Sequence, residues 1–276
     1  MFTLNCKGKL ITTDVPLVMG IINATPDSFY EGDLNKGMDG ILALATKMIA
    51  EGATILDIGG QSTRPGSERI SVEKETDRVI PVIKMIHDHF PDAILSIDTY
   101  QSAVAIAAVE AGASIVNDVS AGEMDKKMIA AVAALHVPYI CMHLKGTPNT
   151  MQLFAEYENV LKEVLDYFVY KIKECRDAGI KDIIIDPGFG FAKNATHNFT
   201  LLKNLHILKM LDCPILAGIS RKSTIYKTLG ITAAEALNGT TVLNTLALNN
   251  GANILRVHDV KEAVEAVKLM ECYKIV

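Results

Sequence analysis

Eight short apolar or β-branched runs recur along the chain and alternate with segments of helical spacing. The runs lie at 17–23, 54–57, 93–98, 114–117, 138–143, 182–186, 214–219 and 253–258. The helical segments lie at 36–50, 73–87, 101–111, 125–135, 156–178, 198–211, 233–248 and 260–270. Short strands that are apolar on both faces need cover on both sides, as in a parallel sheet surrounded by helices. Eight strand–helix units of this kind predict an α/β protein with a (β/α)8, or TIM, barrel.

A doubly wound open sheet is the competing architecture. Such sheets usually contain fewer units, and those that bind dinucleotides carry a G-x-G-x-x-G turn after a strand, which this sequence does not contain. Barrels commonly reach about 250 residues as one domain, so we expect residues 1–276 to form a single domain. Residues 1–13, with Lys7-Gly8-Lys9 at their centre, predict a short N-terminal β-hairpin ahead of the barrel.

Composition argues against several kinds of partner. The formal net charge of −5 does not suit a general binder of nucleic acid or of anionic membranes. No apolar run reaches the roughly 20 residues of a membrane span, and residues 1–9 lack the pattern of a signal peptide. The five cysteines are scattered without a C-x-x-C spacing, so neither a disulfide framework nor a cysteine metal site is indicated. We therefore expect a cytoplasmic protein with reduced thiols and small-molecule partners, with no nucleic-acid and no membrane partner.

Polar residues gather at the predicted C-terminal ends of all eight strands, which is the end where (β/α)8 barrels build their active sites. In chain order they are Asn23, Asp57 with segment 59–66, Asp98 and Thr99, Asn117 and Asp118, His143, Asp186 with segment 187–188, segment 220–223, and segment 256–259. Any one of them could simply cap a helix or satisfy a loop. Their shared position favours a functional site, because buried charges are costly unless they are paired or used.

The residue types at these ends divide into two sets. Asp98, Asn117 and Asp186 can pair with the N–H edge of a planar heterocycle and Lys222 can donate to its carbonyl, as an aminopyrimidine-like ring requires. Arg256, His258 and Asn23 come from the eighth and first strands and suit phosphate or pyrophosphate, together with the helix start that follows His258. Asn23 and phosphate oxygens could hold Mg²⁺, which keeps several waters and needs few protein ligands.

Alternative interpretations of single residues stay open at this point. His258 could be an ordinary strand-end histidine, and a zinc role is less favoured without further clustered ligands. Lys222 as a Schiff-base lysine is conceivable, although it follows Arg221 outside a clear strand interior. Segment 25–29 could be an ordinary turn, but Pro26 fixes φ and should direct the loop away from the strand end.

Taken together, the strand-end motifs closely resemble those of the dihydropteroate synthase family. The resemblance covers nearly the whole chain and rests on the matching segments 23–29, 57–66, 96–99, 117–118, 142–143, 186–190, 220–223 and 256–260. Members of this family act in the folate pathway and are inhibited by sulfonamides. They join 6-hydroxymethyl-7,8-dihydropterin diphosphate to p-aminobenzoate and release pyrophosphate, with Mg²⁺, on a barrel that usually dimerises. The resemblance implies the same transferase activity, the same cofactor and a homodimer here.

The resemblance also implies roles for individual residues. Those expected to hold the pterin are Asp98, Asn117, Asp186 and Lys222, with Arg256 against its ring. Met142, Phe189 and Gly218 are expected to be further substrate-binding residues. Arg256 and His258 would also hold the diphosphate, with Asn23 meeting both the diphosphate and Mg²⁺. The p-aminobenzoate site would be shaped by Phe29, Thr63, Pro65 and Ser223, with the loops of Asp27 and Arg64 closing over it. The implied mechanism resembles SN1 chemistry: diphosphate departs first, Asp98 stabilises the pterin cation, and the aniline nitrogen then attacks.

The sequence departs from the common family pattern just after Phe29, where Tyr30-Glu31-Gly32-Asp33 replaces a Ser-Asp-Gly-Gly-like segment. We expect altered loop geometry there rather than lost activity. Two alternatives belong to other functional classes. A related pterin barrel that transfers methyl from methyltetrahydrofolate would not need segments 63–65 and 220–223. A catalytically silent pterin binder should have lost loop or diphosphate residues, which this chain keeps.

Overall fold

The structure, a computed structural model, describes residues 1–24, 34–61, 69–148 and 150–275 of the chain. A two-stranded antiparallel hairpin comes first, formed by β1 (Thr3–Cys6) and β2 (Lys9–Thr12), as predicted. The eight strands that follow are β3 (Leu17–Asn23), β4 (Ile55–Gly59), β5 (Ile94–Asp98), β6 (Ile115–Asp118), β7 (Tyr139–Met142), β8 (Ile183–Asp186), β9 (Leu216–Ala217) and β10 (Ile254–Val257).

These eight strands form one parallel sheet that closes on itself. Its order is β8-β7-β6-β5-β4-β3-β10-β9, so each strand lies beside its neighbours in the chain. A parallel bridge between Ile185 and Ile215, with an N–H···O distance of 2.9 Å from Ile185 to Pro214, joins β8 to the segment entering β9. The predicted (β/α)8 barrel is therefore confirmed, while the assignment of residues 1–276 to a single domain stays a prediction.

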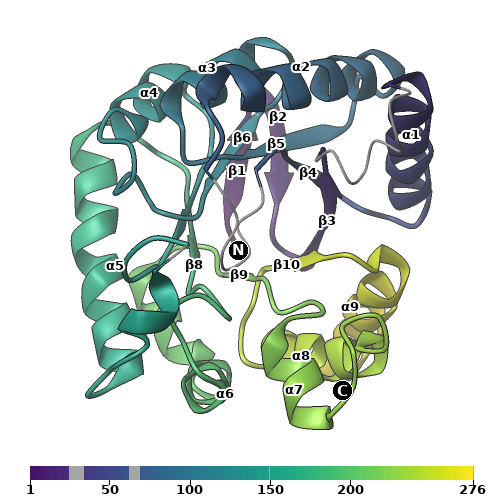
Figure 1. Cartoon of the computed structure of the whole chain (residues 1–276). Coiled ribbons are helices and arrows are strands. Elements are labelled where there is room, and N and C mark those ends of the chain that lie inside the picture. Colours follow the sequence, from purple (N-terminus) through teal and green to yellow (C-terminus); the bar gives the residue numbers. More distant parts are fainter. Residues whose placement is uncertain (25–33, 62–68, 149, 276) are drawn as a thin grey trace.

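Helices surround the barrel (Figure 1). They are α1 (Leu34–Ala50), α2 (Val72–His89), α3 (Ser102–Glu110), α4 (Met128–Leu135), α5 (Val160–Asp177), α6 (Ala195–Lys203), α7 (Ser223–Leu229), α8 (Leu237–Asn249) and α9 (Val260–Ile275), with 3-10 helices η2 (Met151–Phe154) and η3 (Leu205–Leu211). No helix in the described part of the chain is long and apolar enough to cross a membrane.

Several boundaries differ from the sequence expectation, each for a local reason. Helix α5 begins at Val160 rather than at residue 156, because the Asn159 side chain accepts the Lys162 N–H as a cap. The predicted helix 198–211 is two elements, α6 and η3. The run 214–219 contains only two strand residues. Helix α7, which the sequence analysis missed, follows β9 and ends at Gly230, whose φ is +68°.

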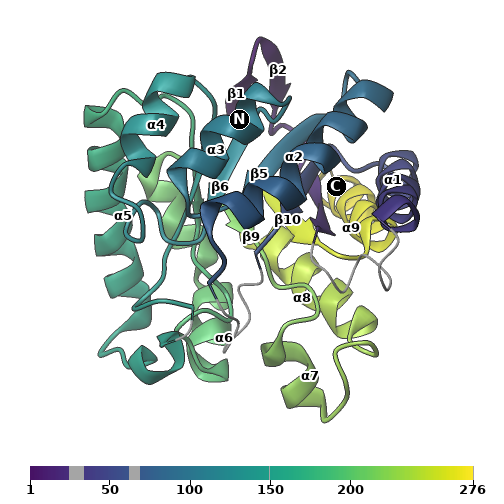
Figure 2. The same cartoon turned by 45° about the horizontal axis from the view of Figure 1, so that its top comes forward.

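The core has separate layers on the two sides of the sheet. The larger layer lies between the strands and the surrounding helices. A second layer fills the lower end of the barrel and receives one or two apolar side chains from every strand: Leu17, Met19, Ile55, Ile94, Ile115, Ile140, Ile184, Leu216 and Ile254. Leu4 and Cys6 of the hairpin complete this layer, so the hairpin closes this end of the barrel, which is at the top in Figure 2. The opposite end of the strands is left for the site.

Candidate active site

The direction of each strand-end side chain follows from the lower apolar layer. Side chains alternate across a strand, so residues two or four positions after an inward apolar residue also face the interior of the barrel. The inward positions that this count gives include Asn23, Asp57, Ser96, Asp98, Asn117, Met142, Asp186, Gly218 and Arg256, which we call the inward polar set. All except Asp57 and Ser96 were named as site residues from the sequence. The same two-residue count, applied to the sequence, would have found both.

Arg256 is the centre of this set. Its Nε donates to Asp57 Oδ2 at 2.6 Å and its Nη2 donates to Asp98 Oδ2 at 2.6 Å. Asn117 Nδ2 donates to the same Asp57 oxygen at 3.0 Å. Asp57 is completely buried. A buried ion pair offsets the cost of desolvating its two charges only when the two groups are held in good hydrogen-bonding geometry. The guanidinium plane of Arg256 is therefore fixed before any substrate arrives.

The environment of Asp98 raises its pKa. Burial raises the pKa of Asp98 to about 7, against the opposing charge of Arg256, and the neighbouring carboxylates of Asp57 and Glu75 act in the same direction as burial. Two buried oxygen atoms near it, Asp57 Oδ1 and Ser96 Oγ, have no hydrogen-bond partner in the described structure. These residues occupy paired positions on β4 and β5. Unpaired buried polar atoms are costly, so this level of the barrel suits a polar ligand.

Asp186 and Lys222 face each other across Gly218. Asp186 Oδ1 accepts the Gly188 N–H at 2.7 Å, and a Cβ added at Gly218 would lie 3.7 Å from both Asp186 Oδ2 and Lys222 Nζ. Lys222 Nζ also donates to the carbonyl oxygen of Phe189 at 2.6 Å. Burial raises the pKa of Asp186 and lowers the pKa of Lys222 to about 8. The pair presents an acceptor and a donor to the same space.

An apolar cluster lies beside the C-terminal ends of the strands, at the open end of the barrel that we call its mouth. It consists of Tyr100, Val119 and Met142, with the partly buried Met124, Leu144 and Phe191 packed against them. Lys222 Nζ lies 4.6 Å from the centroid of the Phe191 ring. Phe189, which the sequence analysis named, is different: its ring is buried in the layer between sheet and helices, and only its carbonyl meets Lys222. The turn through Gly188 and Gly190, at φ +72° and +82°, explains why Phe191 rather than Phe189 joins the apolar cluster.

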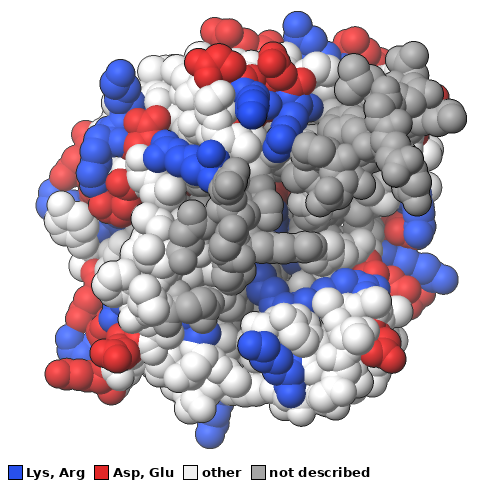
Figure 3. Space-filling view, viewed as in Figure 1, with Lys and Arg blue, Asp and Glu red and all other residues white. Residues whose placement is uncertain are grey.

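The residues expected at the phosphate lie beside Arg256. Asn23 and His258 are exposed at neighbouring strand ends, and Ser223 is the first residue of α7. Ser220 Oγ lies 3.0 Å from His258 Nδ1. Although His258 as a residue is exposed, the side of its ring that faces Ser220 is partly buried. Desolvation there, and then the charge of Arg256, lower the pKa of His258 to about 4, so its ring is neutral near pH 7. Lys and Arg side chains are visible in a hollow near the middle of this face (Figure 3).

Other strand-end candidates point away from the interior and hold loops. Asp118 accepts from the Ser120 backbone at 2.8 Å, the Gly122 backbone at 2.7 Å and the Tyr139 hydroxyl at 2.8 Å. His143 Nδ1 is bonded to Lys193 Nζ at 2.9 Å. Thr99 Oγ1 accepts the N–H of Gln101 at 3.1 Å. Counting in twos from the lower layer places all three off the inward set.

Five expected site residues, Asp27, Phe29, Thr63, Arg64 and Pro65, lie outside the described residues, as do Tyr30 and Glu31. The described part of the chain contains no group of three or more His, Cys, Asp or Glu residues that could hold a metal ion. A magnesium ion that takes most of its ligands from substrate phosphate and water would still fit the exposed carboxamide of Asn23.

Known proteins match this chain over nearly its whole length. Residues 19–258 match the model of the family described as pterin binding enzyme. The dihydropteroate synthase of Escherichia coli K12 is 41% identical over 96% of this chain and 94% of its own length. A Xanthomonas albilineans dihydropteroate synthase structure with 4-aminobenzoic acid superposes with a TM-score of 0.93 at 40% identity, covering 99% and 98% of the two chains. The same enzyme in complex with 7,8-dihydropteroate gives a TM-score of 0.89 at 38% identity and full coverage of both chains.

The barrel, the inward polar set and these matches define a pterin-binding enzyme. Within that class the chain belongs to the dihydropteroate synthase family, the transferases that form dihydropteroate in folate biosynthesis. The family resemblance inferred from the strand-end motifs is confirmed.

Proposed function

We propose that the inward polar set binds 6-hydroxymethyl-7,8-dihydropterin diphosphate and that the site joins it to p-aminobenzoate. The observation that carries this proposal is the arrangement of Asp98, Asp186, Lys222 and Arg256 around one space above the apolar bottom of the barrel. A buried cluster of fixed charges of both signs suits a polar, planar ring better than an apolar ligand.

Each part of the pterin has a matching group. Asp186 Oδ2 and the Asn117 amide can pair with the ring's N–H edge, and Lys222 can donate to its carbonyl. Met142 and Phe191 offer apolar surface for a ring face, beside the polar contacts. The orphaned oxygens Asp57 Oδ1 and Ser96 Oγ would gain a polar neighbour when the ring is bound.

The diphosphate would extend toward the strand ends of β10 and β3. Arg256 supplies a guanidinium, and neutral His258 supplies an imidazole that can donate a hydrogen bond. Asn23 would contact Mg²⁺, which when bound would neutralise charge on the departing diphosphate. Ser223, together with Phe29, Thr63 and Pro65, would shape the p-aminobenzoate site next to it.

Asp98 is placed to act on the reaction itself. As the bond between the pterin methylene carbon and the diphosphate oxygen breaks, positive charge develops on the ring, and an ionised Asp98 carboxylate stabilises it electrostatically. The aniline nitrogen then forms the new C–N bond and loses a proton. Asp27 and Arg64 would exclude water when their loops close. This route needs no covalent nucleophile on the protein, which agrees with a site built from fixed charges.

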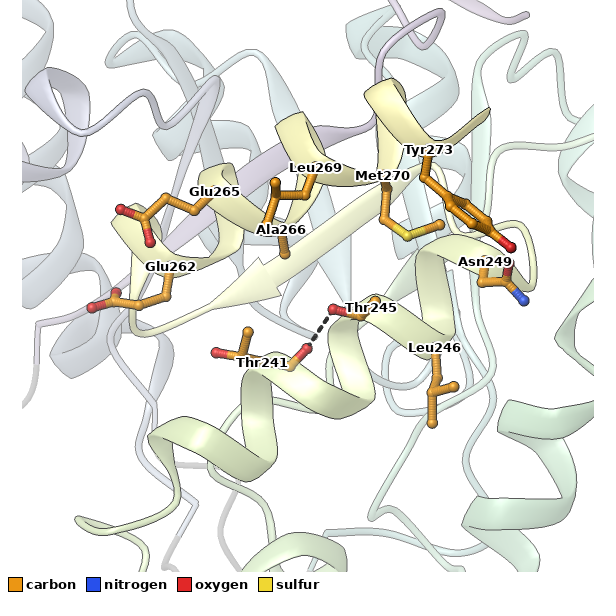
Figure 4. A pocket seen from close by; sticks show the side chains of 10 residues that line it. All are labelled: Thr241, Thr245, Leu246, Asn249, Glu262, Glu265, Ala266, Leu269, Met270 and Tyr273. Atoms are coloured by element: carbon orange, nitrogen blue, oxygen red, sulfur yellow. Dashed lines mark hydrogen bonds between the residues drawn. The ribbon is translucent and has the colours of Figure 1, made fainter. Parts of the chain in front are cut away.

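A homodimer is the proposed assembly, supported by an apolar groove on the outside of the barrel. The groove has a volume of about 530 Å³ and lies between α8 and α9 (Figure 4). Leu246 on α8 and Leu269 and Tyr273 on α9 line it and are 43%, 72% and 70% exposed. Exposed apolar surface of this kind is typical of a protein interface, and a two-fold axis would pair the groove with itself.

The proposed location is the cytoplasm. The five cysteines are all free thiols, which supports a reducing compartment.

The proposed reaction can be tested by release of pyrophosphate. With Mg²⁺ and the pterin diphosphate, the purified chain should release pyrophosphate much faster when p-aminobenzoate is present, and dihydropteroate should form in equal amount. A methyltransferase and a silent pterin binder both predict no p-aminobenzoate-dependent signal. A second test addresses the pterin site itself: Lys222→Ala should weaken pterin binding in a calorimetric titration. The proposal fails if pyrophosphate is not released with both substrates present.

A further inference from the structure

Contacts between the loops that follow β9 and β10 have no direct part in the proposed reaction. Ser220 Oγ lies 3.0 Å from His258 Nδ1 and accepts the backbone N–H of His258 at 3.2 Å. One residue further on, Arg221 Nε donates to Asp259 Oδ2 at 2.7 Å and Arg221 Nη2 donates to Asp259 Oδ1 at 2.8 Å. Two adjacent residues of one loop therefore hold two adjacent residues of the other.

Arg221 fixes the spacing of these loops. Its φ of +53° is a left-handed conformation that costs free energy for a residue with a Cβ. Its Nη1 also donates to the carbonyl oxygens of Ala233 at 3.0 Å and Ala234 at 2.6 Å, and its backbone N–H donates to Thr240 Oγ1 at 3.1 Å. These bonds offset the unfavourable backbone and leave Ser220 little freedom to move away from His258.

The hydrogen bonds of Ser220 determine where its proton lies. A hydroxyl group has one proton and two lone pairs, and the His258 backbone N–H occupies one lone pair. Among the described residues, His258 Nδ1 is the only acceptor within hydrogen-bonding distance of Ser220 Oγ. The geometry therefore allows the hydroxyl proton to be directed to Nδ1. A neutral imidazole that accepts at Nδ1 carries its own proton on Nε2.

We propose that Ser220 is a positioning residue that fixes His258 as the Nε2–H tautomer, with the Arg221–Asp259 ion pair keeping the two loops at the required spacing. An Nε2–H group can donate to a phosphate oxygen, whereas the other tautomer would present a lone pair and repel it. The benefit to binding rests on the proposed role of His258 at the diphosphate. The tautomer itself belongs to the substrate-free protein and can be measured without any reaction.

The first test is a spectroscopic one. In long-range ¹H–¹⁵N spectra of the full chain with ¹⁵N-labelled histidine at pH 7, His258 can be assigned among the seven histidines by the loss of its signals in His258→Gln. We expect an unprotonated Nδ1 and a protonated Nε2. Ser220→Ala should move both nitrogen shifts toward averaged values as the Nδ1–H form becomes populated. Ser220→Thr, which keeps the hydroxyl, should retain the original pattern.

A nearby hydroxyl provides the matched control. Thr228 on α7 donates to the carbonyl oxygen of Thr224 at 2.6 Å within its own helix, so Thr228→Val should leave the His258 signals unchanged. A proton found on Nδ1 in the unmodified chain would overturn the proposal, even if Ser220→Ala did not fold. The same holds if Ser220→Ala and the unmodified chain give identical His258 shifts.

The second test uses inorganic pyrophosphate as the ligand in calorimetric titrations. Ser220→Ala should weaken its binding about fivefold, the usual loss for one neutral hydrogen bond, while Ser220→Thr and Thr228→Val stay within about twofold of the unmodified chain. In the His258→Gln background, Ser220→Ala should cause no further loss; additive losses would show that Ser220 acts independently of His258. An unmodified chain that bound no pyrophosphate would instead contradict the proposed function, and the nitrogen shifts would still decide the role of Ser220.

Discussion

At the scale of single residues, Asp98 and Lys222 lie in the same charged cluster and both have pKa values near neutral pH. Burial raises the pKa of Asp98 to about 7 and lowers the pKa of Lys222 to about 8. Asp98 must be ionised to stabilise a cation, and Lys222 must be protonated to donate to a carbonyl. Both groups are therefore in their useful states only in a narrow range of pH. The apparent values will belong to the interacting cluster rather than to one residue.

We accordingly predict a bell-shaped dependence of kcat/KM on pH. As pH falls below about 7, Asp98 takes up a proton and the rate should fall. As pH rises above about 8, Lys222 loses its proton and the rate should fall again. Asp98→Asn should remove the acid limb and lower kcat by roughly 100-fold. Lys222→Arg should move the basic limb out of the measured range, because arginine stays protonated. An acid limb that persists in Asp98→Asn would assign it to another group.

The sequence was most informative about residues whose direction follows from strand alternation. Asn117 and Asp186 were expected in the site, and both lie on the inward face of their strands. Asp57 was noted at a strand end, and the same alternation would have placed it in the site, but nothing in its neighbourhood shows that Arg256, 199 positions away, donates to it. Ion pairs between distant strands depend on barrel closure, which local sequence does not encode.

At the scale of elements, the loop after β8 sets the apolar side of the site. The family resemblance of segment 186–190 led us to expect Phe189 in the site, but two left-handed glycines, Gly188 and Gly190, redirect the chain. Gly188 also lies against the chain just after β7, since a Cβ there would clash with the carbonyl oxygen of His143. As a result Phe191 joins Met142 at the mouth and Phe189 packs beneath the helices.

This difference predicts different effects for substitutions of two phenylalanines that are only two residues apart. Phe191→Ala should raise KM for the pterin diphosphate about tenfold, because it removes a ring from the mouth, and should change stability little. Phe189→Ala should lower the free energy of unfolding by about 3–5 kcal/mol, because it leaves a cavity in the outer core. Steady-state kinetics and urea unfolding separate the two. If Phe189→Ala changes KM and Phe191→Ala changes stability, the assignment is reversed.

Element boundaries were predictable where caps or glycines mark them, and not elsewhere. Eight strands and eight of the helices were recognised from apolar spacing. The missed helix α7 has seven residues and follows a two-residue strand, so neither carries a long periodic signal. Position in a closed sheet makes β9 a strand, since its neighbours β10 and β8 supply the pairing. Tertiary context, rather than local propensity, decides such short elements.

At the scale of the whole molecule, the two ends of the barrel have separate tasks. The hairpin and the lower apolar layer close one end, and the charged set occupies the other. The α8–α9 groove lies on the outer helical face, away from both. Assembly through that groove would leave the strand ends of each protomer open to substrate. Oligomeric state and catalysis should therefore be separable by substitution.

Leu269→Glu tests this separation. A carboxylate in the groove, beside Glu265 and Glu262, would have to be desolvated on association, so the variant should sediment as a monomer at micromolar concentration while the unmodified chain sediments as a dimer. Val169→Glu on α5 is the matched control, because Val169 is 58% exposed on a helix that does not line the groove. The Val169→Glu variant should remain dimeric.

Since the groove lies away from the charged set, kcat/KM per protomer of Leu269→Glu should stay within about twofold of the unmodified chain. A dimeric Leu269→Glu variant would place the interface on another face, and a large loss of activity in a folded monomer would mean that association shapes the mouth of the barrel.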